Sequence, residues 1–201
     1  MRICILFIPR SGSQYLEEII GSNFKSVLRF GELFIYPRQV PAAIKLLDST
    51  DSANITVRLS VVSTISPHFT EIIDCLKRNN FTFLVLRREV SDTLLSFAYA
   101  SESNVWAKRD SSALNKVTIH DPSAMVWIYN EIKMFDKRIE EMKVDYQTVH
   151  YETMVQDLEK IFNKKMDLSD TYIIKQLGNT PYNYIENSTA VSSFIESLRK
   201  S

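Results

Sequence analysis

Hydrophobic residues along the chain alternate between short continuous runs and patterns of helical period. Nearly unbroken apolar runs at residues 3–8 and 81–86 are typical of strands that are buried on both faces of a sheet. Three further segments predict strands at 24–30, 55–62 and 146–150. Apolar residues spaced three or four apart predict helices at 14–20, 41–47, 67–78, 90–99, 153–163 and 189–198, with the first ending near Gly21.

The clearest helix lies between the last two predicted strands. Its apolar positions are spaced 3, 4, 3, 4 and 3 residues apart, at Met125, Ile128, Ile132, Phe135, Ile139 and Met142. This spacing forms one continuous stripe along a long helix and predicts packing against the core. The segment before it, residues 106–119, is polar and predicts a loop.

The order of these elements predicts the fold class. Strands that alternate with helices favour an α/β fold of three layers, in which helices cover both faces of a mostly parallel sheet. We interpret residues 1–201 as a single domain of this kind. In such sheets ligands bind beyond the carboxyl ends of the strands, so the motifs that directly follow a strand carry most of the functional information.

Composition excludes several classes of protein. The 201 residues are 45% hydrophobic with a formal net charge of zero, which is typical of a globular chain and does not predict broad attraction to nucleic acid or to anionic membranes. The apolar run at residues 3–8 is too short for a secretory signal, and no segment approaches 18 apolar residues. Cys4 and Cys75 both lie in apolar patterns and predict buried free thiols. We therefore expect a soluble cytoplasmic protein without a membrane span, and the oligomeric state stays open.

An unusual turn follows the first predicted strand. Residues 9–13 read Pro-Arg-Ser-Gly-Ser, in a chain that has only four glycines. Gly12 permits a backbone turn that a Cβ would obstruct, so that successive N–H groups and the next helix start can face one anion. Arg10 adds a permanent cation. Further side-chain donors come from Ser11, Ser13 and Gln14. An ordinary strand–turn–helix connection with a capping serine fits the same residues.

A second candidate motif follows the strand predicted at residues 81–86. Arg88 leaves the end of this strand, and Ser96 lies eight residues later in the following helix. A guanidinium and a hydroxyl in these places could converge on a second phosphate. The alternative is a surface ion pair and an unrelated helical serine.

Together the two motifs resemble those of the sulfotransferase superfamily, whose members use 3′-phosphoadenosine 5′-phosphosulfate (PAPS). Residues 9–13 are similar to the family's 5′-phosphosulfate loop, with arginine where many members have lysine. Arg88 and Ser96, with Asp92 between them, are similar to its 3′-phosphate motif. The resemblance runs from about residue 3 to about residue 163 and is nearest to bacterial carbohydrate sulfotransferases. It implies a P-loop-like sulfotransferase fold.

The resemblance also implies a general base. The bacterial subgroup carries a Gly-Glu pair before an aromatic residue, and the matching glutamate here is Glu32. A surface carboxylate is the other reading of Glu32, and His120 is the rival base because other members use a histidine. Arg58 stands where many members have a basic residue near the transferred group. Residues 149–154 resemble a strand end that follows in many members, and we interpret their role as structural.

The activity implied is transfer of a sulfuryl group from PAPS to a hydroxyl of a small molecule or carbohydrate, without a metal and with PAP as product. Glu32 and Arg10 would be catalytic. The nucleotide would be bound by Arg10, Ser11, Gly12, Ser13, Gln14, Arg88 and Ser96. Two alternatives stay open. One is a kinase-like phosphoryl transferase, although no Gly-Lys-Ser/Thr sequence occurs. The other is a degenerate domain that binds a nucleotide or a protein without turnover.

Overall fold

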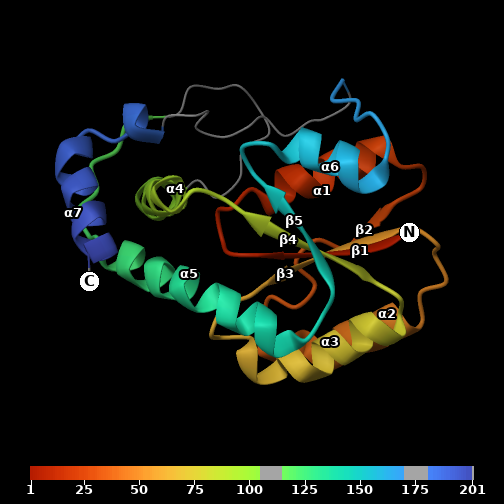
Figure 1. Cartoon of the computed structure of the whole chain (residues 1–201). Helices are drawn as coiled ribbons and strands as arrows, with labels where there is room; N and C mark the ends of the chain where they lie inside the picture. The colour runs from red at the N-terminus through yellow and green to blue at the C-terminus, as the bar shows by residue number, and fades with distance from the viewer. Residues whose placement is uncertain (105–114, 170–180, 201) are drawn as a thin grey trace.

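The computed structural model describes residues 1–104, 115–169 and 181–200. Its centre is a sheet of five parallel strands in the order β2-β3-β1-β4-β5 (Figure 1). The strands are β1 (Arg2–Phe7), β2 (Leu28–Arg29), β3 (Ile55–Ser60), β4 (Thr82–Arg87) and β5 (Tyr146–His150). Parallel pairing requires a crossover between strands, and at least one α-helix lies in each of these connections.

Helices cover both faces of the sheet. Figure 1 shows α1 (Ser13–Asn23) and α6 (Met154–Phe162) on one face. On the other face lie α2 (Val40–Asp48), α3 (Phe69–Arg78) and α5 (Ser123–Met142). The helices α4 (Val90–Ser103) and α7 (Ser188–Lys200) lie at one side. The predicted three-layer α/β fold is therefore confirmed, and all five strands are parallel.

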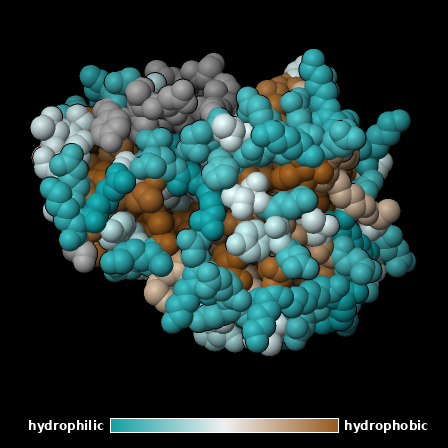
Figure 2. Space-filling view, viewed as in Figure 1, coloured by the Kyte–Doolittle hydropathy of each residue, from teal (hydrophilic) through white to brown (hydrophobic). Residues whose placement is uncertain are grey.

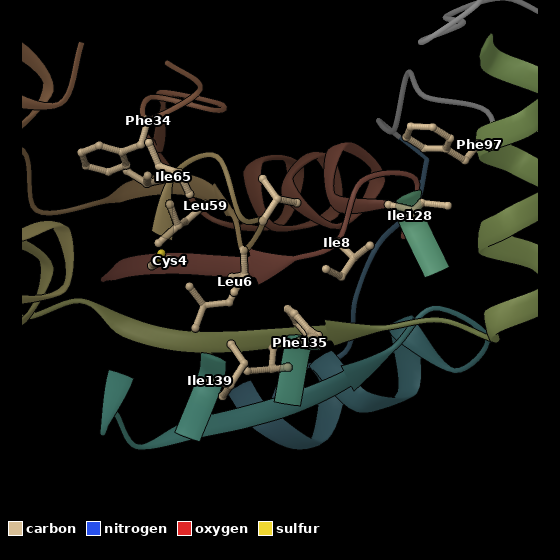
Figure 3. Close-up of a cluster of buried hydrophobic side chains, with 14 of the residues drawn as sticks. Cys4, Leu6, Ile8, Phe34, Leu59, Ile65, Phe97, Ile128, Phe135 and Ile139 are labelled. Atoms are coloured by element: carbon tan, nitrogen blue, oxygen red, sulfur yellow. The ribbon is translucent and has the colours of Figure 1, made fainter. Parts of the chain in front are cut away.

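Strand β1 explains why the core has two halves. Alternate residues of a strand point to opposite faces of the sheet. Ile3 and Ile5 pack in the cluster under α1 and α6, whereas Cys4 and Leu6 pack in the larger cluster on the other face. Figure 3 shows Cys4, Leu6 and Ile8 among side chains from several other elements. On the face shown in Figure 2, hydrophilic side chains cover most of the surface and hydrophobic residues show between them.

Two details differ from the prediction, and most of one predicted loop lies outside the described residues. The second strand shrinks to β2, two exposed residues at the edge of the sheet, because Ser26 takes a left-handed conformation that interrupts the extended chain. Helix α1 does not end near Gly21 but continues to Asn23, and the missing Cβ at Gly21 leaves room for the Arg29 side chain. Of the loop predicted at residues 106–119, residues 106–114 lie outside the described part.

The carboxyl ends of the strands meet at one edge of the sheet. Just beyond these ends, the Val61 N–H donates to the Phe7 carbonyl (2.9 Å) and the Tyr151 N–H donates to the Arg87 carbonyl (2.8 Å). The turns after β1, β3, β4 and β5 are thereby held side by side. This edge is where a ligand is expected in a parallel sheet.

Candidate functional site

The turn after β1 forms a cradle of backbone N–H groups. Arg10 and Gly12 both have left-handed backbones, with φ of 70° and 97°, and the Ser11 N–H donates to the Ile8 carbonyl (3.1 Å). Helix α1 begins at Ser13 without a side-chain cap and without an acidic residue in its first turn. The first N–H groups of a helix have no acceptor inside the helix, so this turn presents several donors to an anion.

Two features require glycine at position 12: its left-handed backbone and the close approach of the Tyr151 ring. A Cβ built at this position would lie 2.4 Å from the Cδ2 and Cε2 atoms of Tyr151. Tyr151 follows β5, is 6% exposed, and packs its ring against the turn at Gly12. The ring of a residue far along the chain therefore supports the cradle from below.

We predict that Gly12→Ala destabilises the protein by at least about 1–2 kcal/mol, the cost of a left-handed alanine, and displaces the Tyr151 ring as well. Urea denaturation measures this change. Gly21→Ala is the matched control, because its Cβ would meet only the flexible Arg29 side chain (2.9 Å to Cδ) and alanine favours a helix interior. Indistinguishable unfolding midpoints for the two variants would contradict the role assigned to Tyr151.

The two predicted phosphate motifs lie in direct contact. Arg10 Nε donates to Ser96 Oγ (3.1 Å), and Arg88 Nη1 donates to the Arg10 carbonyl (2.9 Å). The guanidinium of Arg88 also stacks over the Tyr151 ring, 4.3 Å from its centroid. Ser96 is 2% exposed on α4. The turn after β1, the end of β4 and the end of β5 thus converge on one basic cluster.

This cluster contains buried donors that the described residues do not use. Arg88 Nε and Nη2 and Ser11 Oγ are buried and have no hydrogen-bond partner within the described part of the chain. Unpaired buried donors of a charged group are costly, and native structures rarely keep them without a purpose. Burial, together with the neighbouring charge of Arg88, lowers the pKa of Arg10 to about 10. The unused donors of the Arg88 guanidinium, next to a second cation at Arg10, fit an anionic ligand.

Asp92 lies near this cluster and limits its net charge. Burial raises the pKa of the Asp92 carboxyl, while the charge of Arg88 acts to lower it. Asp92 is in the first turn of α4, where a carboxylate is stabilised by the helix dipole. Glu152 and Glu89 also act to raise the pKa of Asp92, so three carboxylates lie near the two arginines.

A second polar group lies on the other side of the cradle. Arg58 on β3 is 8% exposed, its Nε lies 3.0 Å from Glu17 Oε2, and its Nη1 donates to Ser13 Oγ (3.2 Å) and to Glu32 Oε1 (3.3 Å). Burial raises the pKa of Glu32; Arg58 acts to lower this pKa and Glu17 to raise it. The Glu32 side chain is 30% exposed, so it lies beside the cradle and reaches solvent. Arg58 is thus paired with two carboxylates.

The remaining candidates lie in different surroundings. Gln14 is exposed in the first turn of α1. His120 is exposed in the segment before α5, where its backbone N–H donates to Glu102 Oε1 (2.8 Å), and no described contact joins it to the cluster. Tyr151 was expected only to end a strand. Its place directly after β5, beside Arg87 and Arg88 in the sheet register, is the sequence signal that could have pointed to it.

In the rest of the described structure, any second candidate binding site is weaker than the one at the carboxyl edge of the sheet. A cavity of about 430 Å³ lies at the amino edge of the sheet, lined by Met1, Arg2, Ala53, Arg78, Asn79 and Asn80. Its Arg2 and Arg78 are already bonded, to Asn79 and Asp48 respectively. Among the described residues, no cluster of three or more His, Cys, Asp or Glu is placed to hold a metal ion. No helix within the described ranges is both long and apolar enough to cross a membrane.

Comparisons with known proteins give distant likenesses in fold. A mouse sulfotransferase complexed with PAP is 16% identical, with a TM-score of 0.49 and coverage of 81% of this chain. This chain spans 57% of that sulfotransferase. A tunicamycin resistance protein of Deinococcus radiodurans is 10% identical, with a TM-score of 0.46, and the match covers 82% of this chain and 96% of that one. No protein-family model matches the sequence, and no curated protein matches it. Likenesses of this degree do not assign a function, which has to be argued from the side chains.

Proposed function

We propose that the chain binds PAPS at the carboxyl edge of the sheet and transfers its sulfuryl group to the hydroxyl of a small-molecule acceptor, with carbohydrates as the first class to test. The observation that carries this proposal is the meeting of Arg10, Arg88 and Ser96, which belong to the two motifs that resemble phosphate sites. A nucleotide with phosphates on both its 3′ and 5′ positions needs two anion sites within one nucleoside of each other. In this proposal the cluster would supply both.

Each part of the cluster has a distinct binding role in this proposal. The N–H groups at the start of α1, with Ser11, Ser13 and Gln14, would bind the 5′ group. Arg88 would bind the 3′-phosphate through Nε and Nη2, the two donors that have no described partner, while its Nη1 stays on the Arg10 carbonyl. Ser96 would add its hydroxyl. Arg–phosphate pairs are commonly bidentate, which fixes the nucleotide in register.

In the transfer step, Glu32 would act as the general base and Arg10 would stabilise the leaving group. PAPS supplies an activated sulfuryl group when bound. Glu32 would take the proton from the acceptor hydroxyl as the new O–S bond forms, and its raised pKa would make it a better base than an ordinary glutamate. Arg10 and the N–H groups of the cradle would stabilise the negative charge that collects on the leaving phosphate oxygen as the old S–O bond breaks.

The cluster favours this proposal over a kinase-like one. Kinases of the P-loop type place a lysine in the loop and a magnesium-binding carboxylate after a strand. Here the loop carries Arg10, and β4 ends at Arg87, with Arg88 directly after it. A domain that binds the nucleotide without turnover would share the cluster, so binding and turnover need separate experiments.

We predict that PAP raises the melting temperature far more than ATP does, because ATP lacks a 3′-phosphate for Arg88 and Ser96. A ligand at 100 times its dissociation constant stabilises a protein by about 2.7 kcal/mol, which a thermal-shift titration detects easily. Equal stabilisation by ATP and PAP would rule out a dedicated 3′-phosphate site.

A further inference from the structure

The polar group around Arg58 holds one more negative charge than positive charge. It combines a single guanidinium with two carboxylates, Glu17 at 3.0 Å and Glu32 at 3.3 Å. The guanidinium is 8% exposed, so solvent screens these charges only weakly. One carboxylate in this trio is therefore left without a full counter-charge.

The contacts show which carboxylate that is. Glu17 has both oxygens engaged, because Thr56 Oγ1 donates to its Oε1 (3.1 Å) and Arg58 Nε lies against its Oε2. Its side chain is 9% exposed. Glu32 has one contact to Arg58, and its side chain is 30% exposed. Glu32 is thus the member of the trio that another molecule can reach.

We propose that Arg58 and Glu17 are positioning residues, which hold Glu32 beside the phosphate cradle as the one carboxylate of a net-negative trio that accepts a proton. This proposal rests on the proposed function, in which Glu32 takes the acceptor's proton. Arg58 aims the carboxylate, because a single nitrogen, Nη1, bonds both Glu32 and Ser13 at the start of α1. Gly31 allows the turn that brings Glu32 to Arg58, because its backbone is left-handed, with φ of 61°.

Glu17 keeps Glu32 basic. A guanidinium facing one carboxylate alone stabilises the charged form and weakens the base, whereas a second carboxylate on the same guanidinium opposes that effect. The charged groups that act on Glu32 are Arg58 from β3 and Glu17 from α1. After one proton is taken up, the trio is neutral. The arrangement therefore favours receipt of one proton at Glu32.

The test is the titration of Glu32 itself, followed by NMR in protein with ¹³C-labelled glutamate carboxyls and assigned with Glu32→Gln. We expect Glu17→Gln to lower the titration midpoint of Glu32, and Arg58→Gln to raise it, relative to the unchanged chain. The matched control is Glu18→Gln, which removes the same charge from the adjacent position of α1. Glu18 pairs with Arg29 at the surface, so this variant should leave the midpoint where it was.

An unchanged midpoint in Glu17→Gln, or an equal fall in Glu18→Gln, overturns the proposal. Arg58→Gln strands Glu17 without its cation and could unfold the chain, but Glu17→Gln removes a charge and keeps Arg58 paired with Glu32. Addition of PAP to the same samples separates the two proposals. If the expected order of midpoints holds while PAP does not bind, the trio is supported and the nucleotide assignment fails. If PAP binds and the expected order of midpoints is not observed, the nucleotide assignment is supported and the trio proposal fails.

Discussion

Replacing Arg88 with alanine should weaken the binding of PAP about 10- to 100-fold. A loss of this size corresponds to about one charge-assisted hydrogen bond to a phosphate, roughly 1.5–3 kcal/mol, and Arg88 has two buried donors that the described residues leave unused. The two donors belong to one guanidinium, so their contributions do not simply add. The fold should change little in stability, by about 1 kcal/mol or less. Arg88 loses its stacking on Tyr151 and its bond to the Arg10 carbonyl, but two unpaired buried donors disappear with it. Isothermal titration calorimetry and urea unfolding measure the two quantities.

The adjacent arginine is the matched control for this variant. Arg87 pairs with Asp136 at the surface (2.6 Å) and takes no part in the cluster. Arg87→Ala should bind PAP as the unchanged chain does. If Arg88→Ala leaves the affinity for PAP intact while lowering the unfolding midpoint, Arg88 has a structural role only.

Replacing Glu32 with glutamine should lower turnover by about 10²- to 10⁴-fold, the usual contribution of a general base. Glutamine keeps the shape and the contact to Arg58, so the affinity for PAP should stay within about twofold. Because a base must be deprotonated to act, turnover of the unchanged chain should rise with pH through the pKa of Glu32, which burial places above the ordinary glutamate range. Initial rates with an accepted hydroxyl substrate, measured across pH, test both expectations.

His120→Asn is the comparison for this second prediction. His120 is exposed before α5 and has no described contact with the cluster, so its loss should change the rate much less. A lost rate in His120→Asn with a nearly normal Glu32→Gln would move the base to the histidine. Loss of PAP binding in Glu32→Gln would show instead that the carboxylate organises the cradle.

Much of the fold follows from local patterns. The parallel sheet was predictable because apolar runs alternate with amphipathic helices, and the stripe from Met125 to Met142 predicted α5 correctly. The rule that strand ends share one edge also predicted that the turn after β1 and the end of β4 would be neighbours. The short β2 was not predictable, since its end depends on the left-handed Ser26 and on an exposed edge.

The inner details of the site could not be read from the sequence. The Arg10 backbone is left-handed, a conformation that residues other than glycine seldom adopt. This residue is also the one whose side chain reaches Ser96. Position 12 needs glycine partly because Tyr151, which lies far away in the sequence, is brought next to it by the sheet. The trio around Arg58 gathers residues from α1, β3 and the loop after β2. Such contacts arise from tertiary packing and leave no mark in local periodicity.

The most direct test of the two-phosphate site is a pair of calorimetric titrations, with PAP and with adenosine 5′-monophosphate, which differ only in the 3′-phosphate. In the unchanged chain PAP should bind about 10- to 100-fold more tightly than the monophosphate, because only PAP reaches the free donors of Arg88. In Arg88→Ala the two affinities should become nearly equal, since the 3′-phosphate has lost its main partner. Equal affinities in the unchanged chain, or a PAP preference that survives Arg88→Ala, would contradict the site proposed between Arg10, Arg88 and Ser96.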